Sequence, residues 1–385
     1  MYALVVVGVG PAGARTARRF AEAGHDVLAL ERGEVGRPLA CSGHVSTDLW
    51  AFLDDGARDA LLQNEVRGAR FHVDGPESAD EGERFYRNEP ISNVIDRVAL
   101  DRRLANLARD AGADVREAHT VTKVEEHTDC VDLTVSTPSG ERAVSTRLIA
   151  GCDGPTSRVR RALSLPEPDE LLHGVLGFDD TPDTGDYVDV HLTPPRFFAW
   201  RIPRGEAGAE YGLAAPPGAD VSARFEALVD AHDADVTRRC SGTIPIGPPA
   251  RTTGDRGFLV GDAAAMTKPF TGGGILYGMT AADVAAETVA PRDPSTLAEY
   301  ESAWRPLASA SVLTAQSRPA RWPARPLGRG GRPHGPPDDI LLAGAPAPAP
   351  ALSVSRRRSA PVPTARSQRR TGAWCALRGP TPPLS

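Results

Sequence analysis

A glycine-rich turn near the start of the chain constrains its fold more than any other feature. An apolar run at residues 4–7 leads into Gly8-Val9-Gly10-Pro11-Ala12-Gly13, and a helical pattern at 14–23 and a second run at 26–30 follow. Short apolar, β-branched runs are typical of buried parallel strands. A strand, a glycine turn, a helix and a second strand form a β-α-β unit. This order therefore predicts a Rossmann-like α/β fold that binds a dinucleotide.

Each glycine of this turn has its own physical task. Gly8 permits a tight turn, Gly10 lets the backbone approach a pyrophosphate, and Gly13 lets the helix pack closely on the strand. The helix N-terminus offers unpaired N–H groups to the phosphates. Glu31 follows the second strand, where its carboxylate can bind both ribose hydroxyls. An acid at this position disfavours a 2′-phosphate, so we expect FAD or NAD rather than NADP.

Two later strand ends bring glycines back towards the same ligand. One apolar run ends in Gly151-Cys152-Asp153-Gly154, and another ends in Gly261-Asp262. The first places backbone, with Asp153, close to the dinucleotide again, unless it is an ordinary strand turn. Asp262 can accept a hydrogen bond from a ribityl hydroxyl, cap the helix expected to begin there, or do both.

A run of three glycines precedes a long helical pattern. Gly272-Gly273-Gly274-Ile275 opens this pattern, which ends near Thr288. Glycines before a helix let bare N–H groups lie against a flat ring and stabilise the anionic edge of a reduced flavin. Taken alone, the glycines also fit a flexible loop. In the order in which the motifs occur, they favour FAD as the cofactor.

This order resembles the FAD-binding fold of the aromatic hydroxylase and geranylgeranyl reductase superfamily. Three segments resemble, more narrowly, the archaeal geranylgeranyl reductase family. The resemblance covers roughly residues 1–310. The three segments are Arg37-Pro38-Leu39-Ala40-Cys41-Ser42-Gly43-His44-Val45-Ser46, Phe198-Ala199-Trp200-Arg201-Ile202-Pro203 and Lys268-Pro269-Phe270-Thr271-Gly272-Gly273-Gly274-Ile275.

The resemblance implies two domains whose segments alternate along the chain. Residues 1–165 and 240–317 are assigned to a Rossmann-like FAD-binding domain, with inserted strands at about 66–95. Residues 166–239 are assigned to an antiparallel substrate-binding sheet. Strands expected at 171–178, 188–192 and 197–202 belong to this sheet and cover the flavin.

The resemblance also implies FAD contacts, which add to those of the motifs. Arg97 has a physical case of its own, because a guanidinium before a helix can clamp a diphosphate. Its alternative is an ion pair with Asp96 or Asp101. The family usually has Gly or Ala where Ser42 and His44 stand, so this loop can differ in shape. The contacts expected are Gly8, Gly10, Ala12, Gly13, Glu31, Cys41, Ser42, His44, Arg97, Val121, Asp153, Gly261, Asp262, Gly273, Gly274 and Ile275.

Cys41 and His44 are the candidate catalytic residues. Saturating an alkene needs a hydride on one carbon, which reduced flavin can deliver, and a proton on the other. Cys41 can donate that proton or only shape the cavity. His44 can relay a proton, because the pKa of histidine lies near neutrality, or be an ordinary loop residue. Trp200 is expected to line an apolar tunnel, or to belong to the core.

The resemblance implies an FAD-dependent reductase that saturates geranylgeranyl chains in archaeal membrane lipid biosynthesis. Its expected partners are an isoprenoid lipid substrate and an electron donor such as ferredoxin, a nicotinamide or a deazaflavin. A flavin-dependent monooxygenase or halogenase of the same fold is the alternative, kept open by Trp200–Pro203. A non-catalytic flavoprotein or lipid-binding module is a second alternative.

Cysteine spacing and hydropathy indicate where such a protein works. The five cysteines are scattered without CxxC spacing, so we expect no metal site and a reduced cytoplasm. No apolar run approaches the roughly 18–20 residues that a membrane span needs. We therefore expect a cytoplasmic protein with peripheral contact at the inner face of the membrane.

The net charge of −6 hides two unlike parts. Residues 1–317 hold 32 basic and 48 acidic residues, with Lys123 and Lys268 as their only lysines. Such a surface suits concentrated salt, so we expect a halophilic source. Residues 318–385 hold 12 Arg and 14 Pro but two acids. We expect this tail to be disordered or the product of a shifted reading frame, and not to bind nucleic acid.

Overall fold

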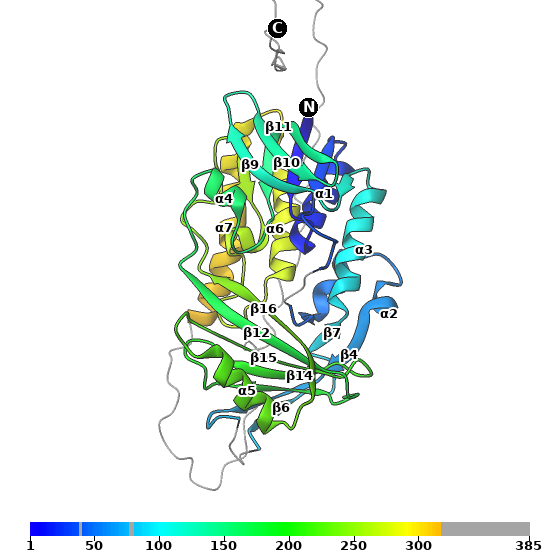
Figure 1. The fold of residues 1–385 in the computed structure, drawn as a ribbon, viewed down its shortest axis with the longest axis vertical. Helices are drawn as coiled ribbons and strands as arrows, with labels where there is room; N and C mark the ends of the chain where they lie inside the picture. Colours follow the sequence, from blue (N-terminus) through cyan, green and yellow to red (C-terminus); the bar gives the residue numbers. More distant parts are fainter. Residues whose placement is uncertain (38–40, 77–80, 317–385) are drawn as a thin grey trace, which may run out of the picture. The chain divides into compact units, whose positions relative to one another are not determined.

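A computed structural model describes residues 1–37, 41–76 and 81–316 of the 385-residue chain (Figure 1). Two predicted features lie outside the described residues. One is the part of the cysteine-containing segment at 38–40, and the other is the Pro/Arg-rich tail at 318–385.

A seven-stranded sheet carries the predicted dinucleotide fold. The strand order is β8-β2-β1-β11-β10-β9, and β17 pairs with β11. β1 runs parallel to β2 and β11, whereas β9, β10 and β11 form an antiparallel meander. The carboxyl ends of the parallel strands therefore meet at one edge, where such folds bind ligands. The bounds are β1 (Tyr2–Val7), β2 (Val27–Leu30), β8 (Asp114–Arg116), β9 (Thr120–Glu126), β10 (Val131–Thr137), β11 (Gly140–Gly151) and β17 (Gly257–Leu259).

The helices on this sheet include the two that the glycine motifs predicted. α1 packs against α3 and α6, and α6 against α7. α1 begins at Pro11, three residues before the predicted start, because proline has a helical φ and lacks the N–H that a first turn leaves unpaired. α6 ends at Thr288, as predicted. The bounds are α1 (Pro11–Glu22), α3 (Arg97–Asp110), α4 (Arg158–Ala162), α6 (Ile275–Thr288) and α7 (Leu297–Gln316).

A second seven-stranded sheet has the order β16-β12-β15-β14-β13-β5-β6. The three strands predicted at 171–178, 188–192 and 197–202 are β12, β13 and β14, which confirms them. The sheet is not purely antiparallel, because β5 runs parallel to β13. The bounds are β5 (Gly68–His72), β6 (Glu83–Tyr86), β12 (Glu170–Asp179), β13 (Tyr187–His191), β14 (Ala199–Pro203), β15 (Ala209–Ala215) and β16 (Val236–Ile246).

The two faces of the second sheet bury different cores. Alternate residues of a strand point to opposite faces. Leu176, Val190 and Trp200 belong to one buried cluster, and Tyr211 and Leu213 pack with α5 (Val221–Ala231) in another. The predicted domain boundary at 239/240 falls inside β16. The division into two domains stays a prediction.

Short elements connect these layers. A three-stranded sheet has the order β3-β7-β4, and α3 begins two residues after β7 ends. The remaining bounds are β3 (His44–Ser46), β4 (Leu62–Val66), β7 (Ser92–Ile95), α2 (Ala57–Leu61), η1 (Thr47–Phe52), η2 (Gly261–Ala264) and η3 (Pro294–Thr296).

Candidate functional site

A cavity of about 790 Å³ connects the two large sheets. Its walls come from the carboxyl ends of the parallel strands, the N-terminus of α6 and one face of the second sheet. Gly13 is the one predicted contact that does not line it. That each lining residue touches a cofactor stays a prediction. The predicted residues that line the cavity are Gly8, Gly10, Ala12, Glu31, Cys41, Ser42, His44, Arg97, Val121, Asp153, Trp200, Gly261, Asp262, Gly273, Gly274 and Ile275.

The first glycine turn has the backbone that its sequence predicts. Gly8 has a φ of +91°, which disfavours any other residue. A Cβ at Gly13 would collide with the carbonyl oxygen of Gly8, so this glycine permits the close packing of α1. Among the described residues, and apart from its two chain neighbours, a Cβ at Gly10 would meet no atom within 4 Å. The space above Gly10 is therefore open to a ligand, and no side chain caps the N-terminus of α1.

Glu31 lies at the end of β2 and contacts the same turn. Its Oε2 accepts a hydrogen bond from the backbone N–H of Val9 at 2.9 Å. The carboxylate is thereby held beside the turn, at the cavity wall.

The two later aspartates have different surroundings. Asp153 accepts hydrogen bonds from the Ser157 hydroxyl and the Arg158 N–H, so its carboxylate is used at the start of α4. Asp262 lies in η2, a single four-residue turn, and not at the start of the helix that we expected. Ala265, in the left-handed conformation, ends this turn. Burial raises the pKa of Asp262 to about 6, although Arg97 opposes the shift.

The triple-glycine run leads directly into α6. Gly272 has a φ of +67° and donates its N–H to the carbonyl of Lys268. No side chain caps the helix N-terminus at Gly274, so its first N–H groups are available at the cavity wall. A Cβ at Gly278 would lie 3.0 Å from the Cβ of Ala12, which brings α6 close to α1.

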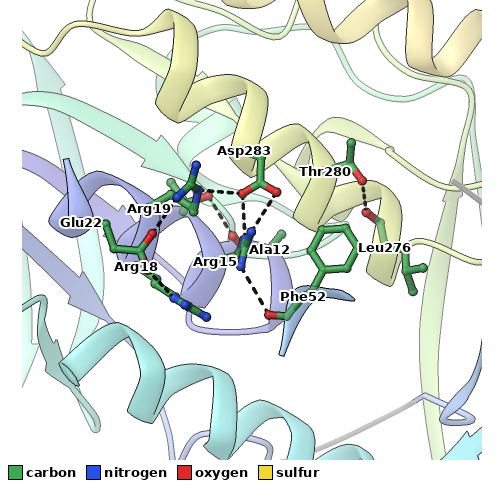
Figure 2. Close-up of polar contacts among 10 residues, drawn as sticks. Ala12, Arg15, Arg18, Arg19, Glu22, Phe52, Leu276, Thr280 and Asp283 are labelled. Atoms are coloured by element: carbon green, nitrogen blue, oxygen red, sulfur yellow. Dashed lines mark hydrogen bonds and ion pairs between the residues drawn. The ribbon is translucent and has the colours of Figure 1, made fainter. Parts of the chain in front are cut away.

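An ion-pair cluster fixes α1 against α6 (Figure 2). Arg15 donates two hydrogen bonds to the carboxylate of Asp283, at 2.7 and 3.0 Å, and Arg19 lies 3.0 Å from the same carboxylate. Arg15 also donates to the carbonyl of Phe52 at 3.4 Å. The cluster, which we name the α1–α6 clamp (Arg15, Arg19 and Asp283), holds two uncapped helix N-termini at one cavity.

Arg97 forms the ion pair that the sequence left as an alternative. Its terminal nitrogens donate to Asp101 at 2.7 and 3.3 Å. Its Nε donates to the Sγ of Cys41 at 3.3 Å. Asp101 and Cys41 thus take part of the guanidinium, which also lines the cavity, and its contact with a diphosphate stays a prediction.

His44 is partly buried beside Ser92. Its Nε2 lies 2.6 Å from the Ser92 hydroxyl. Burial lowers the pKa of His44 to about 4. The imidazole is therefore neutral near pH 7, which corrects the expectation of a pKa near neutrality.

Trp200 belongs both to the cavity wall and to the core beside it. Its indole Nε1 donates to the carboxylate of Glu210 at 2.9 Å. Arg204 lies 3.3 Å from the same carboxylate and donates to the Ser42 carbonyl at 2.9 Å. Burial raises the pKa of Glu210 to about 7, although Arg204 and the Trp200 N–H oppose the shift.

Comparison with known proteins shows the family of this chain. A family model described as an FAD binding domain matches residues 1–190. A digeranylgeranylglycerophospholipid reductase from Methanopyrus kandleri is 32% identical over 334 residues, which cover 78% of this chain and 81% of the relative. The chain belongs to the digeranylgeranylglycerophospholipid reductase family.

Solved structures show that this reductase family shares its fold with other flavoenzymes. A geranylgeranyl bacteriochlorophyll reductase-like protein from Thermoplasma acidophilum has a TM-score of 0.70 at 23% identity, covering 82% of this chain and 83% of its own. A flavin-dependent halogenase has a TM-score of 0.66 at 20% identity, covering 81% and 63%. These likenesses show the fold alone, so the halogenase alternative gains support only at that level.

FAD is the cofactor of this reductase family member. The chain fits FAD, because Gly10 leaves open space beside the uncapped end of α1 and the cavity continues to the uncapped end of α6. No helix in residues 1–37, 41–76 and 81–316 is long and apolar enough to cross a bilayer.

Sequence reasoning missed the charged residues that support this reductase site. Glu210 stands in an otherwise uncharged strand, and all seven residues of that strand are buried. A charged residue in such a strand must find a partner, which was an available signal. The clamp carried no signal, because Arg15 and Asp283 lie 268 positions apart.

Proposed function

We propose that this protein is an FAD-dependent reductase that saturates C=C bonds of geranylgeranyl chains in archaeal membrane lipids. One observation carries the substrate class. A Cβ at Gly272 would lie 3.0 Å from Phe197 and 3.6 Å from Ile244, so the flavin-side turn touches the apolar sheet directly. An alkene held there is enclosed by apolar side chains, which exclude water.

The residues of the chain then supply binding and a proton. Reduced FAD supplies the hydride when it is bound. Cys41 is the proposed proton donor, because His44 is neutral near pH 7 and its Nε2 already lies against Ser92. The guanidinium of Arg97 contacts the Cys41 sulfur and can stabilise the thiolate that proton transfer leaves.

Anaerobic turnover tests this function. The protein is incubated with FAD, dithionite and an unsaturated archaeal ether lipid, and the lipid is analysed by mass spectrometry. We expect a mass gain of two hydrogens per saturated double bond, without oxygen. A monooxygenase or halogenase would need oxygen and would leave the alkenes unchanged. Tight FAD binding without any lipid product would favour the non-catalytic alternative.

The physiological setting is also part of the proposal. Ferredoxin, a nicotinamide or a deazaflavin is proposed as the electron donor. Peripheral contact with the inner face of the membrane is proposed because the substrate is a membrane lipid. The charge of residues 1–317 supports a halophilic source. Unfolding followed from dilute buffer to molar KCl tests that source, and full stability in dilute buffer would contradict it.

A further inference from the structure

Glycines inside the strands of the second sheet mostly have a packing reason. A Cβ at Gly212 would overlap the Trp200 ring, and one at Gly177 would lie 2.6 Å from Phe225. A Cβ at Gly68 would lie 2.5 Å from the Tyr187 ring. These three glycines are required because a side chain already fills the space.

Gly174 has no such reason. A Cβ at this position would have its nearest described contact at 3.6 Å, the carbonyl of Gly242, which is an ordinary van der Waals distance. Its φ is not positive, and the pairing of β12 with β16 is regular through this residue. Glycine inside a strand costs about 0.5–1 kcal/mol relative to alanine, and it often marks a close approach by a ligand.

The position of Gly174 supports a ligand. It lines the cavity, and its direct partner in β16 is Gly242, which also lines the cavity. On its other side, Gly174 pairs with Ala214 of β15. The neighbouring strands β16, β12 and β15 therefore present only glycine or alanine in this row. We name the pair Gly174 and Gly242 the glycine slot.

Apolar side chains border the glycine slot. Leu176, two positions along β12 on the same face, lies on one side. On the other side lies Ile244 of β16, beside the triple-glycine turn. A slot crossing the strands between such walls suits a narrow, extended apolar chain.

We propose that the glycine slot holds the prenyl chain beyond its reacting double bond, and so determines which chain lengths bind. This inference rests on the proposed function, because it takes a prenyl chain as the substrate. A Cβ added at Gly174 enters the slot at ordinary contact distances from the sheet. A chain short enough to stay on the flavin side of the slot remains unaffected.

Binding to the oxidised, FAD-loaded protein tests this without turnover. The probes are geranylgeraniol and the shorter geraniol, measured by calorimetric titration. We expect Gly174→Val to weaken geranylgeraniol binding at least tenfold and to change geraniol binding less than twofold. The matched control is His173→Val, which adds a β-branched residue at the exposed neighbouring position on the other face. It should change neither affinity.

Each outcome has a separate meaning. The FAD content and melting temperature of Gly174→Val should equal or exceed those of the wild type, because valine favours strands. Equal geranylgeraniol binding by wild type and Gly174→Val overturns the slot alone. Loss of FAD from Gly174→Val also overturns it, because the flavin would then occupy this space. A wild type that binds FAD but neither alcohol overturns the proposed substrate together with the slot.

Discussion

The buried carboxylate of Glu210 accepts a hydrogen bond from the indole of Trp200 at 2.9 Å. The same carboxylate pairs with Arg204, which donates to the carbonyl of Ser42 in the cysteine loop. One fully buried acid thus connects an aromatic cavity wall to the loop that carries the proposed proton donor. The contact therefore joins two segments that are distant in the sequence.

Removing Glu210 should therefore destabilise the protein. Glu210→Ala leaves the Trp200 N–H and the Arg204 charge without this partner, and breaking a buried pair costs about 3–5 kcal/mol. Denaturant unfolding measures the loss. Glu206→Ala, at an exposed neighbouring position, is the control and should change stability by less than about 0.5 kcal/mol. Equal stability of the two variants would contradict the structural role of Glu210.

Two glycines of the first turn should separate folding from cofactor binding. Gly10→Ala meets no protein atom, so it should keep the stability of the apoprotein while weakening FAD binding at least tenfold. Gly13→Ala collides with the Gly8 carbonyl and should lower stability by about 1–3 kcal/mol. Thermal unfolding of the apoprotein measures the stability of each variant, and FAD titration measures its affinity for FAD. Normal FAD affinity in Gly10→Ala would show that the pyrophosphate lies elsewhere.

The α1–α6 clamp should affect FAD affinity from a distance. Asp283→Ala removes the carboxylate that two arginines share and should cost about 1 kcal/mol. If the same free energy is lost from FAD binding, the affinity for FAD falls roughly fivefold. Glu22→Ala is the control, because Glu22 pairs with Arg18 and Arg19 on α1 without reaching α6. Equal FAD affinities in both variants would rule out a positioning role.

Cys41→Ser should keep FAD and lose turnover. A positioned proton donor contributes about 100-fold or more to a rate, so single-turnover saturation should slow by that order. Cys130→Ser, at a cysteine between β9 and β10 that is not among the residues lining the cavity, should react at the wild-type rate. An unchanged rate in Cys41→Ser, with FAD intact, would leave the cysteine only a role in shaping the cavity.

Buried histidines should make the fold sensitive to acid. Burial, with His72 and His232 nearby, lowers the pKa of His191 to about 4, and burial lowers that of His44 to about 4. Between pH 6.5 and 4 the unfolded chain binds more protons at these two histidines than the folded protein does. Their contribution to the free energy of unfolding therefore decreases as the pH is lowered. At pH 4 each histidine has lowered the free energy of unfolding by roughly 3 kcal/mol.

The raised pKa values of Glu210 and Asp262 act in the opposite direction. For this reason the histidine contribution is measured as a difference. The free energy of unfolding of His191→Asn should fall less than that of the wild type between pH 6.5 and 4.5. Parallel pH curves would contradict a neutral His191 in the fold.

Local sequence determined the parts of this protein that depend on backbone conformation. The turn at Gly8 and the start of α6 after Gly274 follow from residues next to each other in the chain. Glycine tolerates positive φ, and helix N-termini leave N–H groups unpaired wherever they occur. These rules need no distant partner, so the flavin motifs and the strands that lead into them could be predicted.

Only the tertiary structure decided which partner each charged or buried group meets. Arg97 pairs with Asp101 and contacts Cys41, and burial lowers the pKa of His44 below the neutral range. Glu210 and the glycine slot acquire their roles from strands paired across long stretches of sequence. Which side chains meet, and how far burial shifts each pKa, depends on the packing of the whole fold rather than on neighbouring residues.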